Sequence, residues 1–210
     1  MIPKAIHHVW PGDDEFRYAE WRRTWMKYHS DWTFYFWRLD NLPEGILETT
    51  KKVISDDRVS YVVKSDLIRL EVIRPFGGIF VCTDMECQQS FEKFLKYTSF
   101  CGTFFHTICN ALFGAEKGNK YIEEATIKVG ENICNDPVYA SSSYEGVVSM
   151  SGGRAIRPFF EKFEAVFENI FYVPDKDSYS VHHWTNSNEG GWTALIGIQN
   201  AKNKESLCQV

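Results

Sequence analysis

Two carboxylates follow a short apolar segment and are the side chains best suited to bind a metal ion. Asp84 and Glu86 come after Ile79–Cys82, a run whose composition predicts a fully buried strand. They occupy alternate positions and would face the same side if the strand continued. Carboxylate oxygens are ligands for Mg²⁺ and Mn²⁺, which take their remaining ligands from water and substrate phosphates. A solvent-exposed acidic turn would have the same sequence, because acidic residues usually lie at the surface.

A second pair, Asp66 and Arg69, lies three residues apart in a segment predicted to be helical, so both side chains share one helix face. A simple surface ion pair is the common explanation for such spacing. The functional interpretation is that Asp66 accepts hydrogen bonds from sugar hydroxyls while Arg69 contacts a phosphate or anchors Asp66. The sequence alone leaves both interpretations open.

Near the C-terminus, His182 offers an imidazole, which Mn²⁺ accepts although oxygen suits it better. A hydrogen-bonded structural histidine is the alternative. Trp184 and Trp192 flank the polar, glycine-ended segment Thr185–Gly191, which has the composition of a lid that closes over a ligand.

Apolar periodicity and turn residues predict the elements that position these side chains. Strands are expected at 5–10, 32–37, 79–82, 102–105, 111–113, 171–173 and 179–184, and helices at 16–28, 61–74, 121–129 and 154–169, with a short one opening at Pro43. The helix at 61–74 should stop at Pro75, and the polar segment 135–144 should be a mobile loop. This alternation favours an α/β fold of three layers, in which ligands bind beyond the carboxyl ends of strands. Asp84 lies at such an end.

Size and composition are those of one globular domain. The 210 residues are 44% hydrophobic and 16% aromatic, enough for one buried core. The net charge of -5 and the absence of a Lys/Arg block argue against a nucleic-acid partner. An acidic protein that binds phosphates would need a divalent cation, which favours metal dependence. The six cysteines are scattered, and we find neither a secretory leader nor an apolar membrane span, so we expect a soluble, cytoplasmic protein.

Several segments resemble, in order along the chain, the glycosyltransferases of the sugar-binding DXD-motif family. They are Ile2–Trp10, Ser65-Asp66 with Arg69, and Gly77–Phe80 leading into the acidic tip, with a weaker match at His182-His183-Trp184, Ser187 and Trp192. This family includes initiating mannosyltransferases and is related to the glucosylating clostridial toxins. The strong resemblance covers about the first 90 residues.

The resemblance implies a Rossmann-like GT-A fold with a mostly parallel, mixed central sheet. It further implies one domain over residues 1–210, with a nucleotide-sugar-binding half at 1–100 and an acceptor-side half at 101–210. The chain is short for this fold and ends without an evident closing element, which hints at a fragment of a longer protein.

The same resemblance implies a nucleotide-sugar donor, in the first place a UDP-sugar and less favourably a GDP-sugar, with Mn²⁺ or Mg²⁺ bridging its diphosphate. Asp84 matches the metal-binding aspartate of the motif, and His182 matches a third ligand. Asp66 and Arg69 match residues that contact donor sugar and ribose. Further donor contacts are implied at His8, Val9, Trp10, Gly78, Trp184 and Trp192.

One departure from the motif concerns its first aspartate, which aligns with Cys82. Either Glu86 supplies the missing carboxylate, or metal binding is weaker, or the domain is an inactive binder. A thiolate suits hard cations poorly, so we expect Cys82 to be structural and Asp84 and Glu86 to bind the metal.

The predicted activity is transfer of a hexose or deoxyhexose to a glycan or glycoprotein acceptor. The resemblance favours retention; inversion would need a base, for which Asp136, Glu145 and Glu189 are unranked candidates. A catalytically inactive nucleotide-sugar or glycan-binding domain is the main alternative. A sugar nucleotidyltransferase ranks last, because the acidic segment Pro11–Glu15 would repel a triphosphate.

Overall fold

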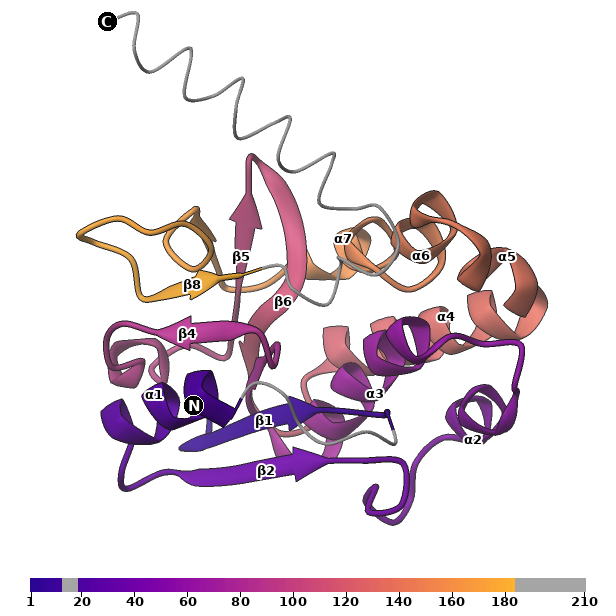
Figure 1. Ribbon diagram of the computed structural model, residues 1–210, viewed down its shortest axis with the longest axis horizontal. Helices are drawn as coiled ribbons and strands as arrows, with labels where there is room; N and C mark the ends of the chain where they lie inside the picture. The colour runs from indigo at the N-terminus through magenta and orange to yellow at the C-terminus, as the bar shows by residue number, and fades with distance from the viewer. Residues whose placement is uncertain (13–18, 184–210) are drawn as a thin grey trace, which may run out of the picture.

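In the computed structural model, residues 1–12 and 19–183 are described, and they form a twisted six-stranded sheet covered on both faces (Figure 1). The strand order is β2-β1-β3-β6-β5-β7. Neighbours are parallel at β1/β2, β1/β3 and β5/β7 and antiparallel at β3/β6 and β5/β6. The strands are β1 (Ala5–Val9), β2 (Thr33–Trp37), β3 (Gly78–Val81), β5 (Ser99–Phe104), β6 (Thr107–Ala115) and β7 (Ala165–Glu168). The predicted α/β fold with a mixed, mostly parallel sheet is confirmed.

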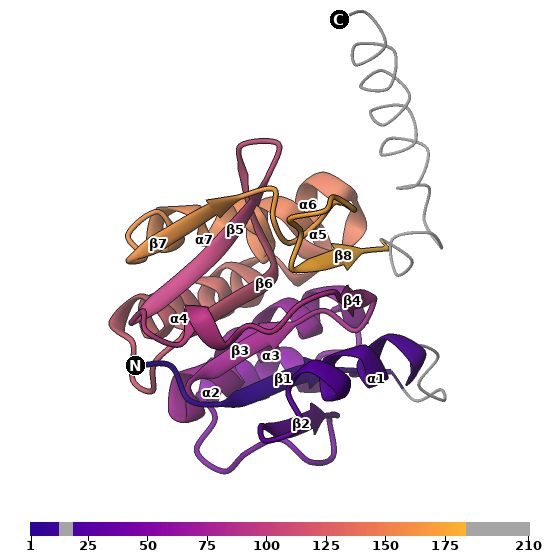
Figure 2. The same ribbon diagram turned by 90° about the vertical axis from the view of Figure 1, so that its left-hand side faces the viewer.

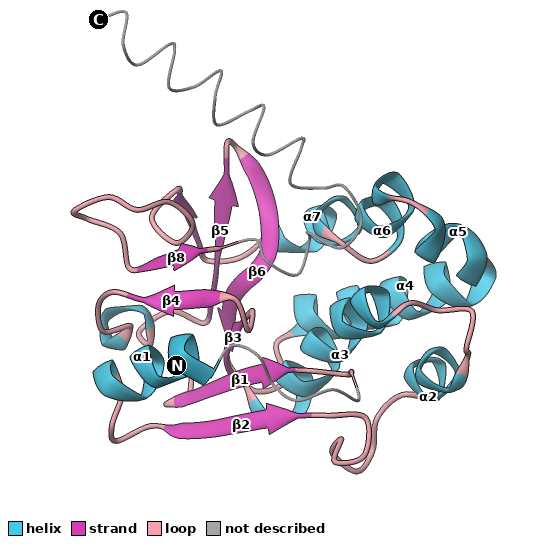
Figure 3. Cartoon of the chain, in the orientation of Figure 1, coloured by secondary structure: helices cyan, strands magenta, loops and turns pink. Residues whose placement is uncertain are grey.

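The layers on the two faces differ in kind. Helices α2 to α7 gather on one face, whereas α1 and a separate two-stranded sheet, β4 with β8, lie on the other (Figures 1 and 3). The elements of these layers are α1 (Ala19–Tyr28), α2 (Glu48–Ser55), α3 (Tyr61–Phe76), β4 (Met85–Cys87), α4 (Lys120–Asn135), α5 (Pro137–Ser142), α6 (Tyr144–Met150), α7 (Gly153–Phe160) and β8 (Ser180–His182), with a 3₁₀ turn at Glu92–Phe94. Among the described helices, none combines the length and apolarity needed to cross a bilayer.

Each face of the sheet has its own hydrophobic core. Leu67 and Leu70 of α3 pack with Ile122 of α4 on the helical face. Trp25 of α1 packs with Phe171 and their apolar neighbours on the other. Burial on both faces explains why β1 and β3 are buried at every position rather than at alternate ones.

The glycine pair between α3 and β3 is required by close backbone contacts. Gly78 has φ of +107°, and a Cβ there would lie 2.8 Å from the Ala5 carbonyl oxygen. Gly77 has φ of +64°, and its Cβ would lie 2.5 Å from the Lys117 nitrogen. Glycine tolerates these conformations without steric cost, so α3 can turn directly into a strand pressed against β1.

Most predicted elements are present, but several helix boundaries were wrong. The helix expected over 121–129 continues to Asn135. The short helix begins at Glu48 rather than at Pro43. Helix α3 continues through Pro75 to Phe76, where the Gly77 N–H bonds the Ile73 carbonyl at 2.8 Å. Pro75 has no N–H to donate to the Glu71 carbonyl, and the helix ends one residue after it.

Three further predictions on the acceptor-side half were wrong. The supposed loop 135–144 contains α5, whose start is capped by the Asp136 carboxylate accepting from the Tyr139 N–H at 3.0 Å. The helix expected over 154–169 ends at Phe160, and the chain returns as strand β7, paired with β5. The segment 171–173 lies in turns rather than in a strand. Figure 2 shows β7 along the edge of the sheet beside β5.

Candidate active site

The acidic tip after β3 is a turn, not a continuation of the strand. The Cys82 N–H bonds the Ala111 carbonyl at 2.8 Å, and the chain then turns into β4, with the Met85 N–H bonding the Cys82 carbonyl at 3.2 Å. This turn separates the two carboxylates that the sequence placed together. Asp84 is buried, whereas Glu86 is half-buried and its carboxylate lies 3.2 Å from the Nε2 atom of His183.

Asp84 meets His182, a residue 98 positions later in the chain. Strands β4 and β8 pair antiparallel with Met85 opposite His182, and the His183 N–H bonds the Asp84 carbonyl at 3.0 Å. This register brings the Nε2 atom of His182 to 2.9 Å from the Asp84 carboxylate. The structure therefore brings together two of the three predicted metal ligands, and both side chains are buried.

Cys82 completes this group in place of Glu86. Its Sγ atom, an Asp84 carboxylate oxygen and an His182 ring nitrogen all lie within 4.8 Å of one another. Among residues 1–12 and 19–183, no other cluster of cysteine, histidine and acidic side chains has this arrangement. We call Cys82, Asp84 and His182 the Cys82 corner.

Asp66 and Arg69 form a buried ion pair on α3 rather than a surface one. The Nη2 atom of Arg69 lies 3.0 Å from Oδ1 of Asp66, and the two side chains are 8% and 6% exposed. A buried pair is stable only if further hydrogen bonds satisfy its remaining donors and acceptors.

Two residues distant in sequence supply those hydrogen bonds. The Asn110 Nδ2 group donates to Oδ1 of Asp66 at 2.9 Å, and the Ser151 hydroxyl donates to Oδ2 at 2.8 Å. The Arg69 Nη1 group donates to the Asn110 carbonyl at 2.9 Å, and the guanidinium lies over the Phe80 ring. Sequence reasoning did not identify the side chains of Asn110 or Ser151. We call Asp66, Arg69, Asn110 and Ser151 the Asp66 network.

The donors of Arg69 are all directed at protein acceptors. Besides Asp66 and Asn110, they face the Ser65 carbonyl at 3.3 Å, the Ser65 hydroxyl at 3.4 Å and the Cys82 sulfur at 3.6 Å. A guanidinium has five N–H groups, and these five contacts account for them. The geometry thus favours the interpretation in which Arg69 anchors Asp66 over the one in which it contacts a phosphate.

Asp66 retains one acceptor position. A carboxylate offers about four lone-pair sites, and Asn110, Arg69 and Ser151 take three of them. The remaining site, on Oδ2, can accept from a hydroxyl such as that of a sugar.

The network and the corner meet at Arg69 and Cys82. Burial raises the pKa of the Cys82 thiol well above its ordinary value; the charge of Arg69 opposes this shift, and Asp84 adds to it. The thiol is therefore protonated at neutral pH when no cation is bound beside it.

The predicted contacts on β1 are placed with their side chains inside the protein. The Nδ1 group of His8 lies 3.1 Å from the Val81 carbonyl, which can only accept, so Nδ1 carries the proton. Burial lowers the pKa of His8 to about 3. Val9 belongs to the hydrophobic core, and Trp10 is half-buried at the carboxyl end of β1. Gly78 lies at the opposite end of β3 from Asp84, so the structure does not bring it to the other candidates.

Comparison with known proteins supports the sequence resemblance. Residues 15–101 match the family described as "Glycosyltransferase sugar-binding region containing DXD motif". In fold, the chain is similar to the structure titled "PaToxG Glycosyltransferase", with a TM-score of 0.60 and 15% identity over 77% of this chain and 68% of that one. A glycosyltransferase involved in glycosylation of the major capsid of PBCV-1 has a TM-score of 0.52 and 11% identity over 85% and 93%. The family match covers less than half of the chain, and the fold of the chain is the GT-A fold of these glycosyltransferases.

Two curated relatives of the chain are fungal proteins. Mannosyl phosphorylinositol ceramide synthase CSH1 of Saccharomyces cerevisiae is 25% identical over 48% of this chain and 27% of its own length. Inositol phosphoceramide mannosyltransferase 3 of Schizosaccharomyces pombe is 22% identical over 58% of this chain and 35% of its own length. The chain therefore spans roughly a third of the length of these relatives.

Two predicted donor contacts, Trp184 and Trp192, lie outside the described residues, as does the predicted lid Thr185–Gly191.

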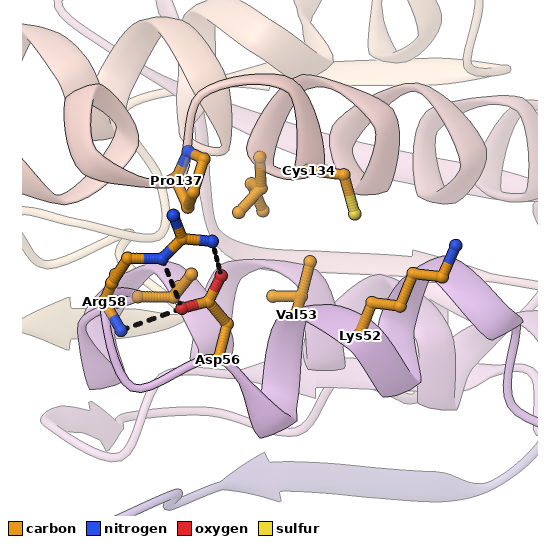
Figure 4. A pocket seen from close by; sticks show the side chains of 8 residues that line it. Lys52, Val53, Asp56, Arg58, Cys134 and Pro137 are labelled. Atoms are coloured by element: carbon orange, nitrogen blue, oxygen red, sulfur yellow. Dashed lines mark hydrogen bonds and ion pairs between the residues drawn. The ribbon is translucent and has the colours of Figure 1, made fainter.

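A pocket of about 290 Å³ lies elsewhere, between α2, α4 and α5 (Figure 4). Its lining includes Lys52, Val53 and Cys134, and its Asp56 carboxylate is paired with Arg58 at 2.7 Å. It contains no residue of the Cys82 corner or the Asp66 network, so it is not the candidate active site.

Proposed function

We propose that this chain transfers a sugar from a nucleotide-sugar donor to an acceptor. The observation that carries the proposal is the meeting of the Cys82 corner and the Asp66 network at the carboxyl end of β3, within a glycosyltransferase domain. Ligands of open α/β sheets bind beyond this end of the strands.

The donor we propose is a UDP-linked hexose or deoxyhexose, less favourably a GDP-sugar, and the acceptor is a glycan or glycoprotein. A second candidate is mannosyl transfer to an inositol phosphoceramide, because both curated relatives carry that activity in their names. The two candidates differ in sugar and acceptor but use the same site.

A divalent cation fits the corner, because an oxygen of Asp84, a nitrogen of His182 and the Cys82 sulfur lie within 4.8 Å of one another, and Asp84 and His182 are buried. We propose Asp84 and His182 as its ligands, with Glu86 as a further carboxylate if the ion is Mn²⁺ or Mg²⁺. When bound, such an ion neutralises negative charge on the departing diphosphate.

We propose that the Asp66 network orients the donor sugar. Asp66 uses its open acceptor position to orient a donor hydroxyl, and Arg69 and Ser151 hold the carboxylate in place. Holding the sugar in one orientation contributes to rate because it removes rotational freedom before the reaction. With retention, the departing phosphate itself takes the acceptor proton, so no side-chain base is required.

The deciding experiment combines binding with turnover. A panel of UDP- and GDP-sugars with Mn²⁺ or Mg²⁺ should contain one donor that raises the melting temperature, because a ligand of the folded state stabilises it. That donor should be hydrolysed or transferred by the wild-type chain and not by Asp84→Asn. Binding without turnover of any donor would support the inactive binding domain instead. If no donor shifts the melting temperature, the proposal is wrong.

A further inference from the structure

The donor atoms of the Cys82 corner are unusual for a site that binds Mn²⁺ or Mg²⁺. They are one thiol sulfur, one carboxylate oxygen and one imidazole nitrogen. Hard cations favour sets made of oxygens, whereas Zn²⁺ binds cysteine, histidine and aspartate together. We propose that this chain binds a Zn²⁺-type cation with Cys82 as a direct ligand, so that its metal preference departs from that implied by the family resemblance.

The spacing of the three atoms suits such an ion. Zn²⁺ lies about 2.3 Å from sulfur and about 2.0–2.2 Å from nitrogen or oxygen, so ligands of a tetrahedral site are about 3.5 Å apart. The three atoms here lie within 4.8 Å of one another, and the Asp84–His182 contact is 2.9 Å. Shifts of about an ångström, within side-chain rotation, would place all three around one ion. Three protein ligands leave a fourth position open, as in catalytic zinc sites.

The surroundings would support a sulfur ligand. The Arg69 guanidinium lies 3.6 Å from Sγ and would face the thiolate that metal binding creates. The backbone of Cys82 is fixed to β6 through Ala111, and Asp84 and His182 are fixed by the β4/β8 pairing. Such outer contacts orient ligands before the ion arrives.

The rival oxygen-rich set requires Glu86 to leave its present partner. Glu86 lies 3.2 Å from His183, and Trp21 stacks on the ring of His183 at 4.3 Å between centroids. Glu86 is outside the group of three potential ligands. Cys82 is already in place, whereas Glu86 would have to be moved.

Cobalt absorption tests the sulfur ligand without any sugar donor. Co²⁺ substitutes for Zn²⁺ and gives a thiolate-to-cobalt absorption band in the near ultraviolet only when sulfur is bound. The metal-free chain, titrated with Co²⁺, should show this band. Cys82→Ser should lose it and bind Zn²⁺ at least tenfold more weakly. Cys109→Ser is the matched control, because Cys109 is a neighbouring cysteine of similar exposure outside the group, and it should keep the band.

Cys82→Asp provides the reverse test by restoring the Asp-x-Asp pattern. Zn²⁺ binds most nitrogen, oxygen and sulfur sites more tightly than Mn²⁺, so the measure is the size of the difference: the melting-temperature shift with Zn²⁺ should exceed that with Mn²⁺ by less in Cys82→Asp than in the wild-type chain. Absence of the cobalt band in a folded wild-type chain, or its persistence in Cys82→Ser, would overturn the proposal. The inference rests on the proposed site but not on its turnover: failure of sugar transfer with an intact cobalt band would refute the proposed function and leave this one standing.

Discussion

The Asp66 network and the Cys82 corner lie at the same end of β3 but contain different kinds of groups. In the network, the Asp66 carboxylate faces the Arg69 guanidinium at 3.0 Å and accepts from Asn110 and Ser151. In the corner, a thiol sulfur, a carboxylate oxygen and an imidazole nitrogen lie within 4.8 Å of one another. The network is built on an ion pair between side chains, whereas the corner is a set of three atoms that can each bind a metal ion.

Because of this difference, we assign the sugar to the Asp66 network and the metal ion to the Cys82 corner. The buried ion pair of the network acts as a rigid support for the sugar, because moving either partner would break several buried hydrogen bonds. The three potential ligands of the corner supply affinity for the metal and, through it, for the diphosphate. Breaking the ion pair of the network should therefore reduce stability, and loss of a corner ligand should reduce activity while the fold persists.

The largest effect is expected from Arg69→Ala, which leaves the Asp66 charge buried without its partner. Breaking a buried pair costs about 3–5 kcal/mol, so the free energy of unfolding in urea should fall by about that amount. Arg154→Ala, which breaks the exposed pair with Glu145, is the control and should cost at most about 1 kcal/mol. Equal losses for the two variants would show that the network is not a structural support.

Asp84→Asn should lower activity and leave the free energy of unfolding nearly unchanged. The amide keeps the shape of the carboxylate and can still bond His182, so the fold should persist, but the charge that binds the cation is lost. Removing one group that stabilises transition-state charge lowers kcat by about 10²–10³-fold. Steady-state transfer rates at saturating metal would measure this. Glu86→Gln is the comparison: a loss as large as that of Asp84→Asn would mean that Glu86 also binds the ion.

The elements that position the site, β1, β3 and α3, were more predictable from the sequence than the contacts within the site. Strands β1 and β3 and helix α3 are apolar segments bounded by proline and glycine, so local pattern sufficed to place them and to put Asp66, Arg69 and Asp84 near one sheet edge. That Asp66 and Arg69 are buried could not be predicted, because burial depends on what packs against α3.

The partners of those residues come from segments that periodicity cannot connect. Ser151 lies 85 positions from Asp66, and His182 lies 98 positions from Asp84. The family resemblance pointed to His182, whereas the turn that separates Asp84 from Glu86 and the role of Ser151 follow only from tertiary packing. For the same reason the acceptor-side half held most of the wrong boundaries: α5 has only six residues and β7 is half exposed, so neither gives a strong periodic signal.

A third prediction concerns the pH dependence of stability at the carboxyl end of β3, where the network and the corner meet. His8 bonds the Val81 carbonyl, and burial lowers its pKa from 6.5 to about 3. The folded state thus favours the neutral ring, so its stabilising contribution is complete above pH 6.5 and is lost as the pH falls towards 3. At pH 5 the loss from this residue is about 2 kcal/mol, at 1.36 kcal/mol per pH unit.

Urea unfolding at pH 7 and pH 5 would measure that contribution. His8→Asn keeps a donor for the Val81 carbonyl but does not titrate, so its stability difference between the two pH values should be about 2 kcal/mol smaller than that of the wild type. An unchanged difference in His8→Asn would mean that the ring is protonated in the folded state.

The smallest effect is expected from Ser151→Ala, which removes one hydrogen bond from the network and leaves its ion pair intact. The hydroxyl donates to Oδ2 of Asp66, the oxygen whose other lone pair is proposed to meet the sugar. A hydrogen bond to a charged group contributes about 1.5 kcal/mol or more, so kcat/KM should fall about tenfold, with little change in metal affinity. Ser149→Ala is the matched control, because that hydroxyl bonds the exposed Glu145 on the same helix and should leave kcat/KM unchanged. If Ser151→Ala instead weakened metal binding, the Asp66 network and the Cys82 corner would be energetically coupled. The separate roles given to them here would then be wrong.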